Sequence, residues 1–309
     1  PPVDTIPKPI AGSVDSVESI DRFGELNGSG KVSRRFLTYR ELLGGRDPGQ
    51  PVDLSAYAVP TAAAHPQHRF AGTLTLSGEA SGGHFSELKD TYNYTGDGDN
   101  TRKHLPEFEF QFIQTGSHIF PLQRGSIAST HPDWEYVLTP GRVWQENGDN
   151  GYSRAAIPFA LQQRNANCMH NGVMSFLFRD DGRVSRVAYQ ISSETCLYFK
   201  ADWWGLLDAR YTPEAITNRK QLILDFQAEI AGRLPVKPLS ALNTDYPGTE
   251  YSAFESPNST DARHISTAGF LIDGIHYRGN CVTRHGNYPY CDSLVIPSYS
   301  AAKSFFAGV

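Results

Sequence analysis

The sequence predicts an α+β fold, in which an antiparallel β-rich domain comes first and one long helix follows it. Short runs that alternate apolar with polar residues recur between positions 69 and 205, as they do in half-buried strands. Glycine (28 residues) and proline (20 residues) are frequent and 12% of the residues are aromatic, which favours turns and sheet over helices. A single stretch, 212–232, has apolar residues near helical spacing and predicts the long helix.

Residues 1–68 are predicted to form an irregular N-terminal segment, because Pro and Gly recur throughout them. The clearest helical candidate in the segment is SRRFLTYRELLGG at 33–45, which Gly44 and Gly45 would end. We therefore expect little regular structure before residue 69.

A β-rich accessory domain is predicted at 69–205. In EFEFQFIQ, residues 107–114, the phenylalanines share one face of a strand and the acidic and amide side chains share the other. Farther along, Asp181 and Gly182 separate two β-rich runs, which is a strong signal for a hairpin turn. Strands joined by such short turns pair antiparallel, so we expect one antiparallel sheet.

The next region, 206–261, is predicted to contain the long helix and a linker. Thr212 is a suitable N-cap, Pro213 suits the first helical position and Gly232 is a stop signal. The stretch that follows the helix carries turn-forming residues and no periodic pattern, which is typical of a linker or an extended surface segment.

A new pattern begins at residue 262. GFLIDGIHYRGN predicts two strands that are joined at Asp273 and Gly274. A short loop between two cysteines comes next, and a further helix is predicted to open near Ser300.

Charge and hydropathy restrict the class of partner. The net charge of −5 and the absence of a Lys/Arg run argue against a nucleic-acid partner. No stretch approaches the roughly 18 apolar residues that a membrane-spanning helix needs. The chain begins PPVDTIPKPI and not with Met, which a removed secretory signal would explain, as would a boundary set within a longer chain.

The four cysteines favour an exported protein. Cys281 and Cys291 flank the turn-rich sequence HGNYP, and Cys168 and Cys196 flank two predicted strands. Four cysteines allow three pairings, of which pairing each with its neighbour is the easiest, and four buried free thiols are the alternative. Because disulfides persist in oxidising compartments, we expect a secreted or periplasmic protein.

The end of the chain carries a serine and a lysine at the spacing Ser-x-x-Lys. On a helix Ser300 and Lys303 would share one face, so the lysine amine could reach the serine hydroxyl. Burial among apolar neighbours disfavours the charged ammonium, which would let the lysine act as a base and activate the serine as a nucleophile. An ordinary serine with a solvated lysine one turn later is the alternative.

With this motif and the strands before it, residues 262–309 resemble the start of the serine β-lactamase and penicillin-binding-protein superfamily. GFLIDGIHYRGN resembles the hairpin that leads into the nucleophile helix, and SYSAAKSFFAGV resembles that helix. The form Ser-x-Ser-x-x-Lys-Ser-Phe at 298–305 is similar to the branch that contains class C β-lactamases, serine carboxylesterases and nylon-oligomer hydrolases.

The resemblance implies that a β-lactamase-like catalytic domain, with opening strands and a nucleophile helix, starts at 262–309. Ser300 would be the acylated nucleophile and Lys303 its base. The expected reaction is acyl transfer to water from a small-molecule or peptide-like ester, amide or β-lactam substrate, and no cofactor is implied.

The resemblance also has a gap. The superfamily uses a third group, usually the tyrosine of a Tyr-x-Asn motif, and this chain has no such motif. The chain ends at Val309 inside an apolar stretch. We therefore expect the catalytic domain to be truncated here, with the missing C-terminal part of the same polypeptide as a partner.

A non-catalytic β-rich carbohydrate- or protein-binding module is the alternative function. Trp203 and Trp204 would then bind the ligand, although core packing also explains two adjacent tryptophans. A carbohydrate-active enzyme is a third hypothesis, with Glu107 and Glu109 as its acidic pair, because the two share the outward face of one strand.

No metal site is predicted. His65 and His68 lie beside a proline and have no evident third zinc ligand. GDGDN at 96–100 matches only the first half of a calcium loop, and a surface turn explains it better. Cys168 and His170 could form a reactive Cys–His pair, but a disulfide explains Cys168 better.

Overall fold

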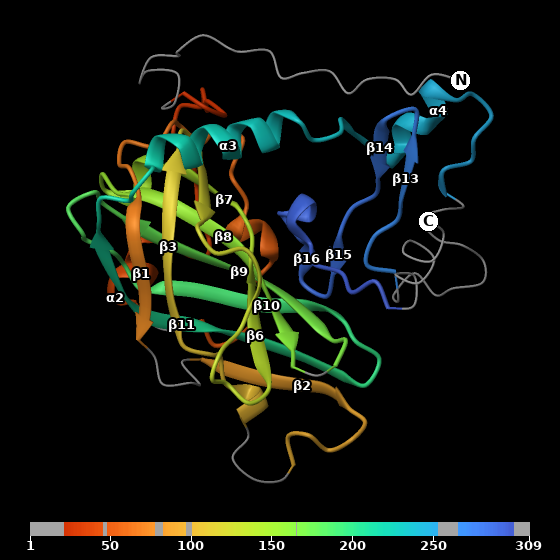
Figure 1. Cartoon of the computed structure of the whole chain (residues 1–309), viewed down its shortest axis with the longest axis horizontal. Helices are drawn as coiled ribbons and strands as arrows, with labels where there is room; N and C mark the ends of the chain where they lie inside the picture. The colour runs from red at the N-terminus through yellow and green to blue at the C-terminus, as the bar shows by residue number, and fades with distance from the viewer. Residues whose placement is uncertain are drawn as a thin grey trace.

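Strands dominate the computed structural model of the chain (Figure 1). They hold 40% of the residues and helices hold 16%, and the described part of the chain has three short helices and no long one. The predicted α+β class with a long helix is therefore wrong. The structure describes residues 22–45, 48–77, 83–96, 101–164, 166–252 and 265–299.

The main sheet is antiparallel throughout and closes on itself. Its central path ends at β9, and β9 also pairs with β8, which lies earlier on the same path. Closure joins the eight strands from β8 to β9, both included, into a ring in which each strand has a paired neighbour on either side. The path runs β5 (Gly125–Ile127), β6 (Trp134–Leu138), β8 (Ser153–Gln163), β7 (Gly141–Gln145), β4 (His118–Pro121), β3 (Phe108–Thr115), β1 (Ala71–Ser77), β11 (Phe199–Pro213), β10 (Val187–Thr195) and β9 (Met169–Phe178), and β2 (His84–Asp90) pairs with β11.

The interior of the closed sheet is filled by large side chains. Phe112, Phe159, Phe176 and Trp203 belong to one core cluster and are at most 1% exposed. The strand predicted from EFEFQFIQ is β3, and the turn predicted at Asp181 and Gly182 joins β9 to β10. The hydrophobic effect therefore fixes which face of each strand points inward.

The outer face of β7 to β10 is buried as well. Trp144, Val173 and Leu177 point to this face and pack against the N-terminal segment through Leu42 and Leu54. Burial on both faces explains why β8 and β9 read as nearly continuous buried runs. The covering segment contains the helix α2 (Tyr39–Gly44) and the 3₁₀ turn η1 (Leu54–Tyr57). Among the described residues, further 3₁₀ turns are η2 (Thr101–Lys103), η3 (Asn147–Asp149), η4 (Leu239–Ala241) and η6 (Cys291–Ser293).

The predicted long helix is shorter than expected. Helix α3 spans Arg219–Ala231, because β11 continues through Thr212 and Pro213 and pairs them with β1. The proline sits at the end of the strand, where it removes no central ladder hydrogen bond, so the sheet overrides the predicted N-cap. The helix ends before Gly232, as predicted.

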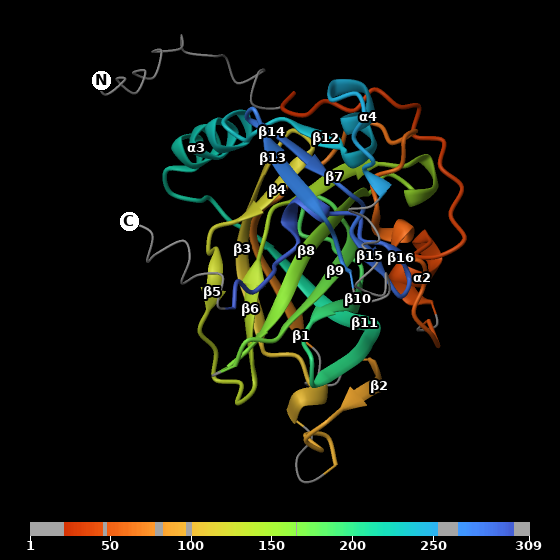
Figure 2. The same cartoon turned by 90° about the vertical axis from the view of Figure 1, so that its right-hand side faces the viewer.

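Helix α3 packs on the outside of β3 and β4. Phe226 and Ile223 of the helix are buried against Ile113 and Phe120 of the two strands. Figure 2 shows α3 at one end of the molecule and β2 at the opposite end.

A small sheet lies next to α3. Its hairpin turns at Asp273 and Gly274, which have φ values of 50° and 74°, as predicted from the Asp-Gly pair. The segment expected to be a linker is partly regular, because it supplies β12 and the helix α4 (Leu242–Asp245). The small sheet has the order β12 (Val236–Pro238), β14 (Ile275–Arg278) and β13 (Gly269–Ile272), and β15 (Val282–Thr283) pairs with β16 (Gly286–Asn287).

Candidate functional site

The two residues with the strongest chemical signal, Ser300 and Lys303, lie outside the described residues. The structure follows the chain that leads to them as far as Tyr299. This approach segment, residues 281–299, runs along the outer face of the closed sheet and contributes Cys281 and Tyr288 to the core there.

Hydrogen bonds fix the approach segment to β9. The amide nitrogen of Asn171 donates to the carbonyl oxygen of Val295 (2.9 Å), and the Val295 N–H donates to the amide oxygen of Asn171 (2.8 Å). The Tyr288 hydroxyl donates to the carbonyl oxygen of Gly172 (2.8 Å). The chain just before Ser300 is therefore held by the most deeply buried part of the sheet.

Tyr299 has an unusual backbone conformation directly before Ser300. Its φ of 45° lies in the left-handed region, which bulky residues rarely adopt. Its hydroxyl donates to the carbonyl oxygen of Thr195 at the end of β10 (3.1 Å). A pocket of about 440 Å³ lies beside this point and is lined by Gln162, Ala166, Asn167, Met169, Pro297, Ser298 and Tyr299.

A cluster of charged groups fixes the turn between β15 and β16 to the same sheet. Arg284 donates to Asp202 of β11 and to Glu194 of β10, both at 2.8 Å. The Nε2 atom of His285 lies 3.0 Å from a carboxylate oxygen of Asp202. Burial raises the pKa of Glu194, although the Arg284 guanidinium partly offsets that effect.

The two predicted disulfides are present. Cys168 pairs with Cys196, and Cys281 pairs with Cys291, so the neighbour pairing is confirmed. Both bonds fit a protein of an oxidising compartment. In the described part of the chain no helix has the length and apolar character needed to cross a membrane.

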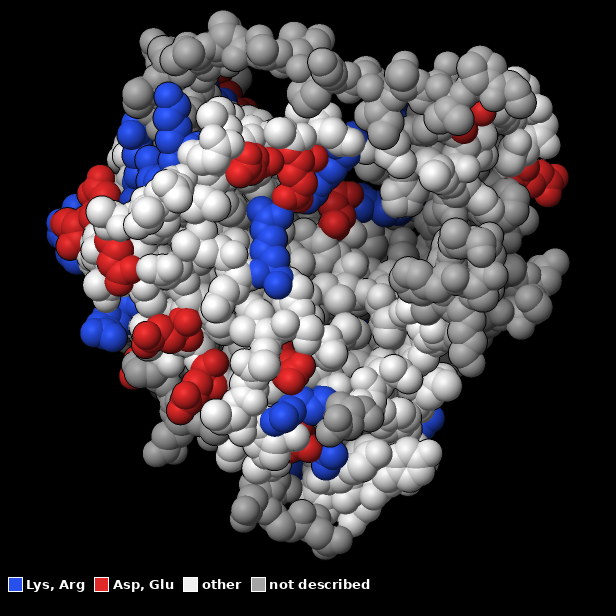
Figure 3. Space-filling model, in the orientation of Figure 1, with Lys and Arg blue, Asp and Glu red and all other residues white. Residues whose placement is uncertain are grey.

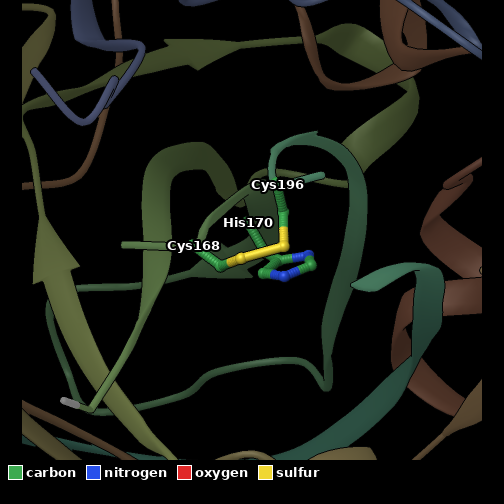
Figure 4. Close-up of side chains that lie close together, drawn as sticks. All are labelled: Cys168, His170 and Cys196. Carbon is green, nitrogen blue, oxygen red and sulfur yellow. A yellow bond between two sulfur atoms is a disulfide. The ribbon is translucent and has the colours of Figure 1, made fainter. Parts of the chain in front are cut away.

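His170 lies beside the first disulfide (Figure 4). One of its ring nitrogens and the two sulfurs lie within 4.8 Å of one another, but the sulfurs are bonded to each other, so only the imidazole could donate to a metal. Cys168 therefore forms a disulfide, as the sequence favoured, and not a reactive pair with His170. Burial lowers the pKa of His170 to about 3, so the ring is neutral.

The tryptophans expected to form a binding surface are inside the protein. Trp203 is 0% exposed and Trp204 is 8% exposed. The Trp204 indole N–H donates to the carbonyl oxygen of Pro48. Trp203 belongs to the core cluster inside the closed sheet and Trp204 points to the opposite face of β11, so neither ring is exposed as a binding surface would require.

The remaining candidates lie apart. Glu107 and Glu109 are exposed at β3, and His68 donates to the carbonyl oxygen of Gly151. The acidic residues of the possible calcium loop, 97–100, lie outside the described residues.

A cleft lies where the closed sheet, α3, the small sheet and the approach segment meet. Its volume is about 950 Å³. In Figure 3 the surface is hollowed between α3 and the part that carries β13 and β14, with basic side chains at the upper edge of the hollow. The charged and imidazole side chains of the lining are His118, Arg142, Arg233, His276, Arg278 and Asp292.

No pattern in the sequence predicts this cleft, because its basic residues are far apart along the chain. His118 and Arg142 come from β4 and β7, whereas Arg233 follows α3 and Arg278 ends β14. The pairing of β4 with β7 places His118 opposite Arg142, and Arg233 and Arg278 join them in the lining of the cleft from outside the closed sheet.

Comparisons with family models, with curated proteins and with solved structures find no match for this chain.

Proposed function

We propose that this chain carries the nucleophile of an exported serine hydrolase. Ser300 attacks an ester, amide or β-lactam carbonyl and becomes acylated, and water then releases the acid. Lys303 takes the proton from the serine hydroxyl and returns it to the leaving group, so the lysine acts first as base and then as acid.

The observation that carries the proposal is the Ser-x-x-Lys motif together with the geometry of the chain before it. The hairpin of β13 and β14 precedes the motif in the order that the superfamily resemblance implies. Tyr299, next to the serine, has a left-handed backbone conformation, and such conformations are concentrated at functional sites. The pocket beside Ser298 and Tyr299 provides space for a small acyl group.

The two disulfides support the exported location. A secreted or periplasmic enzyme of this kind meets its substrates outside the cytoplasm. The binding-module alternative relied on Trp203 and Trp204, and the burial of both rings favours the hydrolase over that alternative.

Covalent labelling tests the proposal. We expect a fluorophosphonate probe or a labelled penicillin to modify the full chain, and Ser300→Ala to abolish the modification. Lys303→Ala should slow the labelling by a factor of about 100 or more, as loss of a general base does.

Ser252→Ala is the matched control, because it removes an exposed serine hydroxyl that lines neither the pocket nor the cleft. It should leave the labelling rate within about two-fold of the wild-type rate, since it removes neither the nucleophile nor its base. No labelling of the wild-type chain, or equal labelling of the Ser300→Ala variant, would refute the proposal.

A further inference from the structure

The cleft between α3 and the small sheet combines positive charge with apolar walls. Its lining contains three arginines and one aspartate, so it carries a net charge of +2 when the histidines are neutral. The whole chain has a net charge of −5. The apolar part of the lining includes Ile230, Leu234, Val236 and Ile296.

Arg142 is the cation without a carboxylate partner. Its Nε and one terminal nitrogen donate to the carbonyl oxygen (3.0 Å) and the hydroxyl oxygen (2.9 Å) of Ser117. Within the described residues no ion pair is formed by this guanidinium, although it is largely buried. Burial lowers the pKa of Arg142, yet a guanidinium stays charged at neutral pH. Its second terminal nitrogen remains available to an anion.

The other two arginines of the lining have acidic partners. Arg278 forms an ion pair with Asp292, and its Nε has no hydrogen-bond partner. Arg233 lies 2.8 Å from Glu229, which is shared with Arg124. Asp292 balances Arg278, whereas Arg233 has only a share of Glu229, so the unbalanced positive charge of the cleft lies on Arg142 and in part on Arg233.

The positive charges of the cleft also affect His118, which lies in its lining. Burial lowers its pKa to about 3, and the nearby positive charges of Arg142 and Arg233 act in the same direction. His118 is therefore neutral, and its buried Nδ1 atom has no hydrogen-bond partner.

We propose that this cleft binds an organic carboxylate, with Arg142 as its principal contact and the apolar walls around the body of the ligand. A guanidinium recognises a carboxylate by parallel N–H···O bonds, and the anion would supply the charge that Arg142 lacks. The volume of about 950 Å³ is that of a site for a small molecule or a short peptide end. The proposal does not depend on catalysis by Ser300, so the Ser300→Ala variant should bind the same ligands.

Calorimetric titration of the full chain with matched pairs of compounds tests the proposal. The probes are 4-phenylbutyrate, hexanoate and benzoate, each compared with its primary amide, and inorganic phosphate. We expect at least one carboxylate to bind and its amide to bind at least about ten-fold more weakly, because a hydrogen bond to a charged group is lost.

Arg142→Gln should weaken carboxylate binding by about ten-fold or more. Arg233→Gln, which changes an exposed residue at the edge of the cleft, should weaken it by about three-fold through the lost positive charge and cannot disrupt the core. Arg183→Gln is the control, because Arg183 pairs with Asp181 at an exposed turn away from the cleft.

Three outcomes would overturn the proposal. These are no binding by any carboxylate of the panel, equal binding of acid and amide, or unchanged affinity in both the Arg142 and Arg233 variants. Tighter binding of inorganic phosphate than of every carboxylate would refute the ligand class.

Discussion

His170 is a buried imidazole that is surrounded by aromatic rings. Its ring lies 5.2 Å from that of Trp134 and 5.1 Å from that of Trp203, centroid to centroid, and neither ring nitrogen has a hydrogen-bond partner. Burial, and secondarily the positive charge of Arg284, lowers its pKa from 6.5 to about 3. The folded chain therefore binds fewer protons at this residue than the unfolded chain between these two pH values.

This difference predicts a loss of stability in acid. Stability falls as the pH drops from 6.5 towards 3, because protons bind preferentially to the unfolded state. His170→Phe keeps an aromatic ring in this apolar site but cannot take up a proton. The free energy of unfolding of the variant should therefore fall less steeply with decreasing pH, by on the order of 1 kcal/mol per pH unit.

Urea unfolding at pH 7, 6, 5 and 4 measures the effect. The difference in free energy of unfolding between the variant and the wild type should grow in favour of the variant as the pH falls. His118→Phe provides the comparison, since the pKa of His118 is also lowered to about 3. Parallel pH profiles for the wild type and His170→Phe would contradict the account.

At the scale of elements, the approach segment has little regular structure of its own. Its strands β15 and β16 have two residues each, and η6 has three. The disulfide between Cys281 and Cys291 closes this segment, and the hydrogen bonds of Tyr288 and Val295 attach it to β9. Cross-linking replaces the stabilisation that longer elements would provide.

Replacing both Cys281 and Cys291 by serine should lower the free energy of unfolding by about 3 kcal/mol, the value expected for opening a loop of this length. The separation of ten residues sets that size. Denaturant unfolding under non-reducing conditions measures the change. Proteolysis of the variant should begin between residues 281 and 299, before cleavage elsewhere in the chain. An unchanged unfolding midpoint would show that the disulfide does not stabilise the segment.

At the scale of the molecule, two segments far apart in sequence cover one face of the closed sheet. The N-terminal segment and the approach segment meet there: the Tyr290 hydroxyl donates to the carbonyl oxygen of Tyr57 (3.1 Å), and the Leu54 N–H donates to the carbonyl oxygen of His285 (2.8 Å). The approach segment that leads to Ser300 therefore packs on the closed sheet. The closed sheet also forms one wall of the cleft between α3 and the small sheet.

Local signals in the sequence predicted local structure. The hairpin turn at Asp273 and Gly274 and the pairing of neighbouring cysteines were correct, because each depends on residues close together in the chain. The start of the long helix was wrong, because pairing of Thr212 with Thr73 of a distant strand outweighs a good N-cap.

In the candidate site, too, only features that depend on residues close together in the sequence could be predicted. Ser300 and Lys303 are three residues apart and could be found by their spacing. Arg142 and Arg278 belong to two different sheets and meet only in the lining of the cleft, and the burial of Trp203 depends on closure of the main sheet. Neither feature leaves a pattern within a short window of sequence.

Identification of the acylated residue tests the central claim most directly. The full chain is treated with a 4-nitrophenyl ester, quenched in acid, reduced and digested with trypsin, and its peptides are weighed. The account predicts one acyl group on the peptide 285–303, located on Ser300 by fragmentation and absent from the Ser300→Ala variant. An acyl group on another residue, or none at all while nitrophenol is released at the uncatalysed rate, would contradict it.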